Sequence, residues 1–135
     1  MNTSIAYVIC ALNEIPSQRA RGFHLMRVDD DGVARPWRIV VVRWGRQVFG
    51  YVNKCPHDGV NLDWERDQFL DPNGIRLICG KHGALFELGT GRCVDGPCKG
   101  QALQPVALHV LDGDICLGGV TLVEDEDDGL DPDAD

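Results

Sequence analysis

Two short segments of this chain pair a cysteine with a histidine, Cys55-x-His57 and Cys79-x-x-His82, and twenty-one residues separate them. Each segment offers one thiolate and one imidazole. The four side chains therefore supply two soft sulfur donors and two nitrogen donors. Such a donor set suits either a tetrahedral zinc ion or a diiron cluster in which sulfur binds one iron and nitrogen binds the other.

The spacing within each segment bears on the choice between these two metals. A zinc ion needs both side chains of a pair to converge on one ion, and chelating pairs usually leave two to four residues between the ligands. Cys79 and His82 meet this requirement, whereas only Pro56 separates Cys55 from His57. In a diiron cluster both cysteines can bind one iron and both histidines the other, so one intervening residue is enough. The spacing favours the cluster, and a structural zinc site stays as the alternative.

The elements that position these segments are expected to be short β-strands, because 16 glycines and 7 prolines in 135 residues indicate many turns. We predict strands at residues 3–12, 23–28, 37–44, 47–53, 75–78, 84–88, 106–110 and 115–123. Residues 13–21 and 93–98 are expected to be loops. The links Gly45-Arg46 and Asp112-Gly113 are typical of hairpins. One predicted strand leads into Cys55 and another into Cys79, so both segments should lie at hairpin tips.

The composition fits one globular domain with an acidic end. A chain of 135 residues is long enough for one core and too short for two of ordinary size. Residues 124–135 hold eight of the 21 acidic residues and no Lys or Arg, which leaves 13 acidic and 13 basic residues elsewhere. We find no basic stripe, no signal peptide and no apolar run long enough to span a bilayer. We therefore expect a soluble cytoplasmic protein that binds neither nucleic acid nor membranes.

The two-segment pattern, followed by Gly83, Phe86 and a Gly96-Pro97 loop, resembles the Rieske 2Fe-2S proteins, especially the small soluble Rieske-type ferredoxins. The resemblance extends from Tyr7 to about Val123. It implies an all-β Rieske fold, in which an antiparallel β-sandwich or barrel-like base carries a small cluster-binding subdomain of two hairpin loops. We expect a single domain at residues 1–123, its cluster-binding subdomain at about 54–100, and a disordered tail at 124–135.

The resemblance also assigns roles to individual residues. Cys55 and Cys79 would ligate the buried iron of one Rieske 2Fe-2S cluster per chain, and His57 and His82 would ligate the outer, more exposed iron. The Gly96-Pro97 loop would cover the cluster and screen it from water. These are the cofactor and metal ligands that we expect in this chain, and we expect no catalytic residues.

Four positions depart from the Rieske proteins of cytochrome bc-type complexes. Those proteins carry a disulfide between the two loops, where this chain has Val60 and Lys81. They also carry a Ser and a Tyr that donate hydrogen bonds toward the cluster sulfurs, where this chain has Ala84 and Phe86. Donors to sulfur stabilise the more negative reduced state, so their absence lowers the reduction potential. We predict a potential in the lower part of the Rieske span of roughly −150 to +300 mV.

The function that the resemblance implies is that of a one-electron carrier between a flavin-dependent reductase and a terminal oxygenase. The sequence shows no nucleophile–base pair and no second metal motif, so we expect an electron-transfer component of an oxidoreductase system without independent catalytic activity. A different class stays open, in which the chain is a redox-responsive or accessory subunit that uses its cluster to bind a partner.

The remaining cysteines and histidines have simpler interpretations. We interpret Cys93 and Cys98 as reduced residues beside the covering loop, with a disulfide or a second thiol site as alternatives. Cys10 and Cys116 are interpreted as core residues. His24 and His109 have no cysteine at a ligand-like spacing and are expected to be surface or core residues. Lys54 and Lys81 flank the ligands and could guide an acidic partner.

Overall fold

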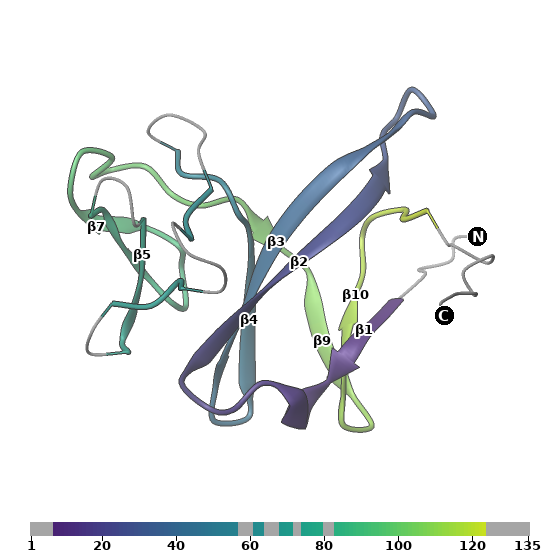
Figure 1. The fold of residues 1–135 in the computed structure, drawn as a ribbon, viewed down its shortest axis with the longest axis horizontal. Helices are drawn as coiled ribbons and strands as arrows, with labels where there is room; N and C mark the ends of the chain where they lie inside the picture. The colour runs from purple at the N-terminus through teal and green to yellow at the C-terminus, as the bar shows by residue number, and fades with distance from the viewer. Residues whose placement is uncertain (1–6, 57–60, 64–67, 72–73, 80–82, 124–135) are drawn as a thin grey trace.

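The computed structural model describes residues 7–56, 61–63, 68–71, 74–79 and 83–123. Within these residues the chain forms ten β-strands and one short 3-10 helix, η1 (Leu12–Glu14). The strands form three antiparallel sheets (Figure 1). The predicted all-β fold is confirmed.

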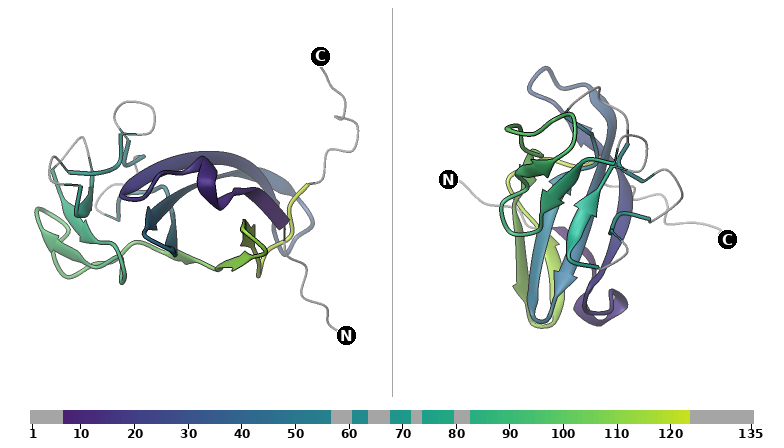
Figure 2. Two further views of the ribbon diagram at one scale, coloured as in Figure 1. Left: turned by 90° about the horizontal axis from the view of Figure 1, so that it is seen from below. Right: turned by 90° about the vertical axis from the view of Figure 1, so that its left-hand side faces the viewer.

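Two of the sheets form the base. The first has the order β1 (Tyr7–Ala11), β10 (Asp114–Leu117), β9 (Leu108–Leu111). The second has the order β2 (Arg19–Val28), β3 (Ala34–Trp44), β4 (Gln47–Val52), β8 (Pro105–Val106). The two sheets face each other, as Figure 2 shows from below. The third sheet, β5 (Arg76–Ile78), β6 (Leu85–Glu87) and β7 (Cys93–Asp95), lies at one end of the molecule, on the left of Figure 1.

Strand β3 separates two hydrophobic cores. Its residues Ile39, Val40, Val41 and Val42 are all fully buried, which requires cover on both faces because successive side chains of a strand point to opposite sides. Ile39 and Val41 belong to the core between the base sheets. Val40 and Val42 belong to a second core that contains both predicted cysteine ligands. The central strand of the base thus also forms a wall of the candidate site.

Both predicted hairpins are confirmed. Strands β3 and β4 pair up to Trp44 and Gln47 across the two-residue link, in which Gly45 has a φ of +64°. Strands β9 and β10 meet across Asp112 and Gly113, which have φ values of +52° and +82°. Two consecutive residues in the left-handed region are what a tight hairpin turn requires, and Asp and Gly tolerate it best.

Some predicted boundaries are wrong. Residues 93–95, which we predicted as part of a loop, form β7 because Cys93 pairs with Phe86 of β6. Strand β2 begins at Arg19, inside the other predicted loop, where the long partner β3 supplies hydrogen bonds. The last strand ends at Leu117 and not at residue 123, because two glycines follow and Gly119 has a φ of +75°. The predicted strand at 106–110 is broken between β8 and β9.

Residues 3–6 of the first predicted strand and the predicted tail at 124–135 lie outside the described residues. In the described part of the chain no helix is long and apolar enough to cross a membrane.

Candidate metal centre

The first ligand segment is anchored by Asn53, which precedes Cys55 by two residues. Cys55 follows the end of β4 and is fully buried. The amide oxygen of Asn53 accepts a hydrogen bond of 2.6 Å from the backbone N–H of Leu62, and its Nδ2 donates one of 2.9 Å to Asp63 Oδ1. Asn53 is the buried polar residue of the described chain, at 5% exposure. It therefore ties together the two ends of the segment that carries Cys55.

The second ligand segment is closed by its own backbone. Cys79 follows β5 and is fully buried. Its backbone N–H donates to the carbonyl of Ala84 over 2.9 Å, and the N–H of Gly83 donates to the carbonyl of Cys79 over 2.7 Å. Gly83 has a φ of +72°, which a glycine adopts without strain. These two hydrogen bonds hold Gly83 and Ala84 next to Cys79.

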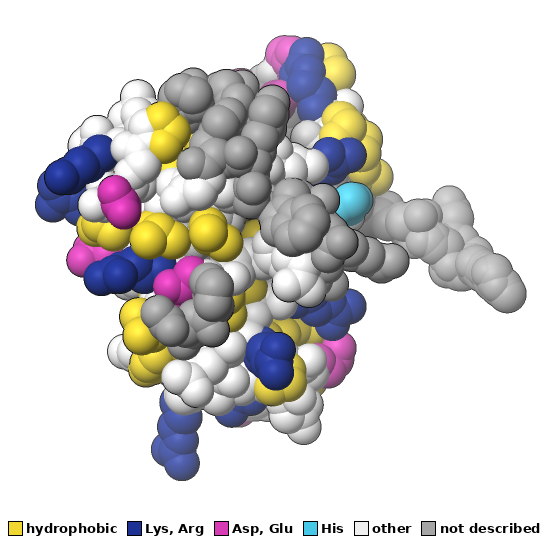
Figure 3. Space-filling view, turned by 60° about the vertical axis from the view of Figure 1, so that its left-hand side comes forward, with side chains coloured by type: hydrophobic (Ala, Val, Ile, Leu, Met, Phe, Trp, Pro, Cys, Tyr) yellow, Lys and Arg dark blue, Asp and Glu magenta, His cyan; other side chains and the backbone are white. Residues whose placement is uncertain are grey.

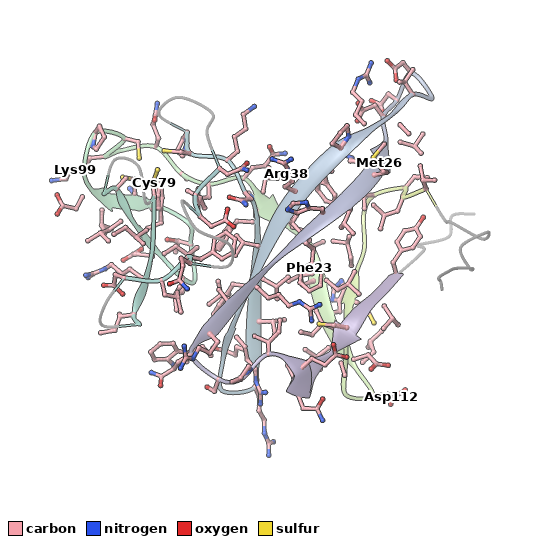
Figure 4. All side chains as sticks on the ribbon, viewed as in Figure 1. Phe23, Met26, Arg38, Cys79, Lys99 and Asp112 are labelled. Carbon is pink, nitrogen blue, oxygen red and sulfur yellow. The ribbon has the colours of Figure 1, made fainter. Side chains whose placement is uncertain are left out.

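The structure brings the two predicted cysteine ligands into one core. Cys55 and Cys79 lie in the same buried cluster, together with Phe69 and Phe86. Figure 4 shows Cys79 at the end of the molecule that carries the third sheet. His57 and His82 lie outside the described residues, as do Val60 and Lys81. Among the side chains that are described, no three His, Cys, Asp or Glu residues converge as a metal site.

The loop between β7 and residue 98 packs against Ala84, which closely follows the second ligand segment. Gly96 has a φ of +101°, and a Cβ at this position would lie 2.7 Å from the Cα of Ala84. Only a glycine permits so close an approach of two backbones. The N–H of Gly96 donates a hydrogen bond of 2.9 Å to Asp95 Oδ1. We call residues 95–97 the covering loop, because Gly96 lies against Ala84, close after the second ligand segment.

Two further cysteines lie under the covering loop. The Cys98 thiol donates a hydrogen bond of 3.0 Å to Cys93 Sγ, and the Cys93 thiol donates one of 3.1 Å to the carbonyl of Asp95. Burial, and next the hydrogen bond with Cys93, raises the pKa of Cys98 to about 12, with smaller contributions from the Cys55 side chain. Cys98 is therefore a neutral thiol at physiological pH, and it lies beside a predicted cluster ligand.

Tyr51 connects the base to the third sheet. It is 3% exposed on β4, and its hydroxyl donates a hydrogen bond of 2.5 Å to the carbonyl of Leu88, just after β6. Its ring lies so close to Gly91 that a Cβ there would be 2.7 Å from Tyr51 Cε1. Burial raises the pKa of Tyr51 to about 12. Sequence reasoning missed both Tyr51 and Asn53, because their partners are distant in the chain and no spacing pattern reveals them.

The structure also places the other residues singled out from the sequence. His24 is exposed and lines a groove of about 670 Å³ with Arg21 and Arg38. His109 and Lys54 are exposed, and Cys10 and Cys116 are buried, as predicted. On the face that carries the third sheet, positive and negative side chains are interspersed (Figure 3).

A family model of the Rieske [2Fe-2S] domain matches residues 5–112 of the chain. The chain therefore belongs to the Rieske [2Fe-2S] domain family, and the resemblance inferred from the ligand segments is confirmed. Membership implies a Rieske-type [2Fe-2S] cluster as the cofactor. No curated protein sequence matches the chain significantly.

Solved structures of oxygenase systems share the fold. The ferredoxin of carbazole 1,9a-dioxygenase from Nocardioides aromaticivorans IC177 is 20% identical with a TM-score of 0.62, over 89% of this chain and 98% of that one. A complex of reduced oxygenase and oxidised ferredoxin in carbazole 1,9a-dioxygenase gives 23% identity and a TM-score of 0.62, with the same coverage. The terminal oxygenase from Novosphingobium sp. KA1 gives 16% identity and a TM-score of 0.64, over 94% of this chain and 31% of that chain.

The described residues fit a Rieske cluster. Two cysteine sulfurs, the donors that such a cluster needs on one iron, lie in a single core lined by aromatic and aliphatic side chains. Burial of the sulfurs matches their expected place on the inner iron. Ala84 and Phe86 are fully buried and bring no hydroxyl group to this core, as expected from the sequence.

Proposed function

We propose that this protein is a one-electron carrier that holds a Rieske [2Fe-2S] cluster on Cys55, His57, Cys79 and His82. When bound, the cluster accepts and releases one electron at a time. The observation that carries the proposal is the burial of Cys55 and Cys79 in one core at the end of the molecule, in a chain of the Rieske family. The two histidines complete the donor set, one in each ligand segment.

Each part of the site has a separate task in this proposal. Asn53 and the backbone turn at Gly83 hold the two cysteines in place, so little rearrangement is needed when the cluster changes charge. The aromatic core around the cysteines excludes water from the inner iron. The covering loop, which packs on Ala84, extends this shield over the second ligand segment. We propose residues 1–123 as a single Rieske domain, with residues 54–100 as its cluster-binding subdomain.

We further propose that the electron passes from a flavin-dependent reductase to a terminal oxygenase, and that the protein works in the cytoplasm. The similarity to a ferredoxin solved in complex with an oxygenase supports the acceptor. This chain aligns with 98% of the Nocardioides ferredoxin but with only 31% of the terminal oxygenase. This difference supports a separate carrier and not the catalytic subunit.

Stopped-flow transfer of electrons tests the carrier role. The cluster-loaded protein is reduced photochemically with deazaflavin, and excess reductant is removed. It is then mixed with oxidised cytochrome c, which serves as a one-electron acceptor. We expect one molecule of cytochrome c to be reduced per cluster, in step with the return of the absorbance of the oxidised cluster. A cluster that takes up an electron but passes none to cytochrome c would overturn the carrier and favour an accessory subunit.

A further inference from the structure

Cys93 and Cys98 form a thiol pair that the proposed electron transfer does not use. Cys93 belongs to β7, Cys98 follows the Gly96-Pro97 turn, and their sulfurs are 3.0 Å apart. Both side chains are buried, at 5% and 2% exposure. In contrast, Asp95, Gly96 and Pro97 between them are exposed. The pair therefore lies directly beneath a surface turn.

The backbone holds the two cysteines together without help from their sulfurs. The N–H of Lys99 donates to the carbonyl of Gly96 over 3.2 Å, and the N–H of Gln101 donates to the carbonyl of Cys98 over 2.9 Å. The N–H of Cys93 donates to the carbonyl of Gln101 over 2.8 Å. A disulfide bond needs its sulfurs about 2 Å apart, so closure would move them by only about 1 Å.

The pair also touches the candidate cluster site. The covering loop between the two cysteines lies against Ala84, with no room for a side chain at Gly96. Cys98 and Cys93 also belong to the same buried core as Cys55. Figure 4 shows Lys99, the neighbour of Cys98, at the same end of the molecule as Cys79. A change in the bonding of Cys98 would therefore be felt at a cluster ligand.

We propose that Cys93 and Cys98 are a redox-active dithiol, which a small-molecule disulfide oxidises to an intramolecular disulfide that locks the covering loop and changes the environment of Cys55. One cysteine attacks the small disulfide, forms a mixed disulfide and releases one small thiol. The other cysteine then attacks the mixed disulfide and releases the second small thiol. The two protein thiols lose two electrons and two protons, which leave on the two small thiols. The effect on the cluster rests on the proposed function, whereas disulfide formation does not.

Mass spectrometry of the cluster-loaded full chain tests disulfide formation. The protein is equilibrated in buffers of varied ratio of reduced to oxidised glutathione, quenched in acid, unfolded and alkylated. Trypsin cuts after Arg92 and after Lys99, so both cysteines fall in the single peptide 93–99. We expect this peptide to lose both alkyl groups together and to become lighter by two hydrogens. Cys10 and Cys116, buried in the base, serve as internal controls and should stay alkylated.

Two results would overturn the dithiol: full alkylation of peptide 93–99 at every glutathione ratio, or glutathione adducts on single cysteines in place of the internal bond. Because this comparison uses the unaltered chain, it does not depend on how a variant folds.

The midpoint potential and the EPR spectrum of the cluster test the coupling. We expect both to shift between the dithiol and disulfide forms of the natural chain. The shift should be absent in Cys93→Ser and retained in Cys10→Ser. A disulfide that forms without any shift would overturn the coupling to Cys55. A disulfide that forms in a chain containing zinc would refute the proposed function and leave the dithiol standing.

Discussion

Gly96 is the residue on which the position of the covering loop depends most directly. A Cβ there would lie 2.7 Å from Ala84 Cα, a backbone atom that cannot move aside by rotating a side chain. We predict that Gly96→Ala destabilises the protein by about 1–3 kcal/mol beyond the cost of its positive φ. It should also speed the loss of the cluster, measured as the decay of visible absorbance during denaturant unfolding.

Gly100 provides a matched control for this prediction. Its φ of +96° is close to that of Gly96, but a Cβ there meets nothing within 4 Å. Gly100→Ala should therefore show the backbone strain alone. Equal effects of the two substitutions on stability and on cluster decay would show that the contact with Ala84 does not matter.

Asn53 stabilises the first ligand segment through its side-chain hydrogen bonds, so we expect its loss to lower both the stability and the iron content of the protein. Asn53→Ala leaves the buried N–H of Leu62 without the amide oxygen that accepts its hydrogen bond. We expect a loss of about 1–3 kcal/mol in the free energy of unfolding, together with a lower iron content of the purified protein. Asn13→Ala, at an exposed position of η1, should change stability by less than about 0.5 kcal/mol. Similar losses in both variants would contradict the role given to Asn53.

At the scale of elements, Tyr51 joins β4 of the base to the third sheet. The tyrosine keeps its proton in the folded protein up to a pKa of about 12, against an ordinary value of 10.0. The unfolded chain therefore releases this proton first, so stability is complete below about pH 10 and falls as the pH rises toward 12. Tyr51→Phe should weaken the protein by about 1 kcal/mol at neutral pH through its lost hydrogen bond. It should also flatten the decline in stability above pH 10, measured by denaturant titrations. An unchanged slope would refute the assignment.

The sequence predicts the elements best where local chemistry determines them. The hairpins at Gly45 and Gly113 follow from turn residues that favour positive φ, and the continuous apolar run of β3 marks a strand covered on both faces. Strand β7 could not be predicted in this way, because its extended form depends on pairing with β6. The early start of β2 likewise depends on the length of β3.

In the candidate site, too, residues marked by local sequence could be predicted and residues whose partners are set by the fold could not. Cys55 and Cys79 are identifiable from residue type and spacing, and the structure buries both in one core. Asn53 and Tyr51 are not, because their hydrogen-bond partners, Leu62 and Leu88, become neighbours only in the fold. Residues with long-range structural roles carry no local signal, whereas the proposed metal ligands do.

At the scale of the whole molecule, the reduction potential reports how the protein surrounds its cluster. With Ala84 and Phe86 buried where hydroxyl donors would stand, we expect a low midpoint. It should fall in the lower part of the Rieske span, and a value above about +150 mV would contradict the argument. Ala84→Ser should raise the midpoint by supplying a donor, measured by redox titration against the unaltered chain.

Metal analysis of the purified protein, combined with an EPR spectrum of its reduced form, decides whether this chain holds a Rieske cluster. We expect two irons per chain and a signal characteristic of mixed histidine and cysteine ligation. The signal should be lost or changed in His57→Ala and His82→Ala, which remove the proposed nitrogen ligands. Zinc in place of iron, together with an EPR-silent reduced sample, would show that the four residues hold a structural zinc ion and no Rieske cluster.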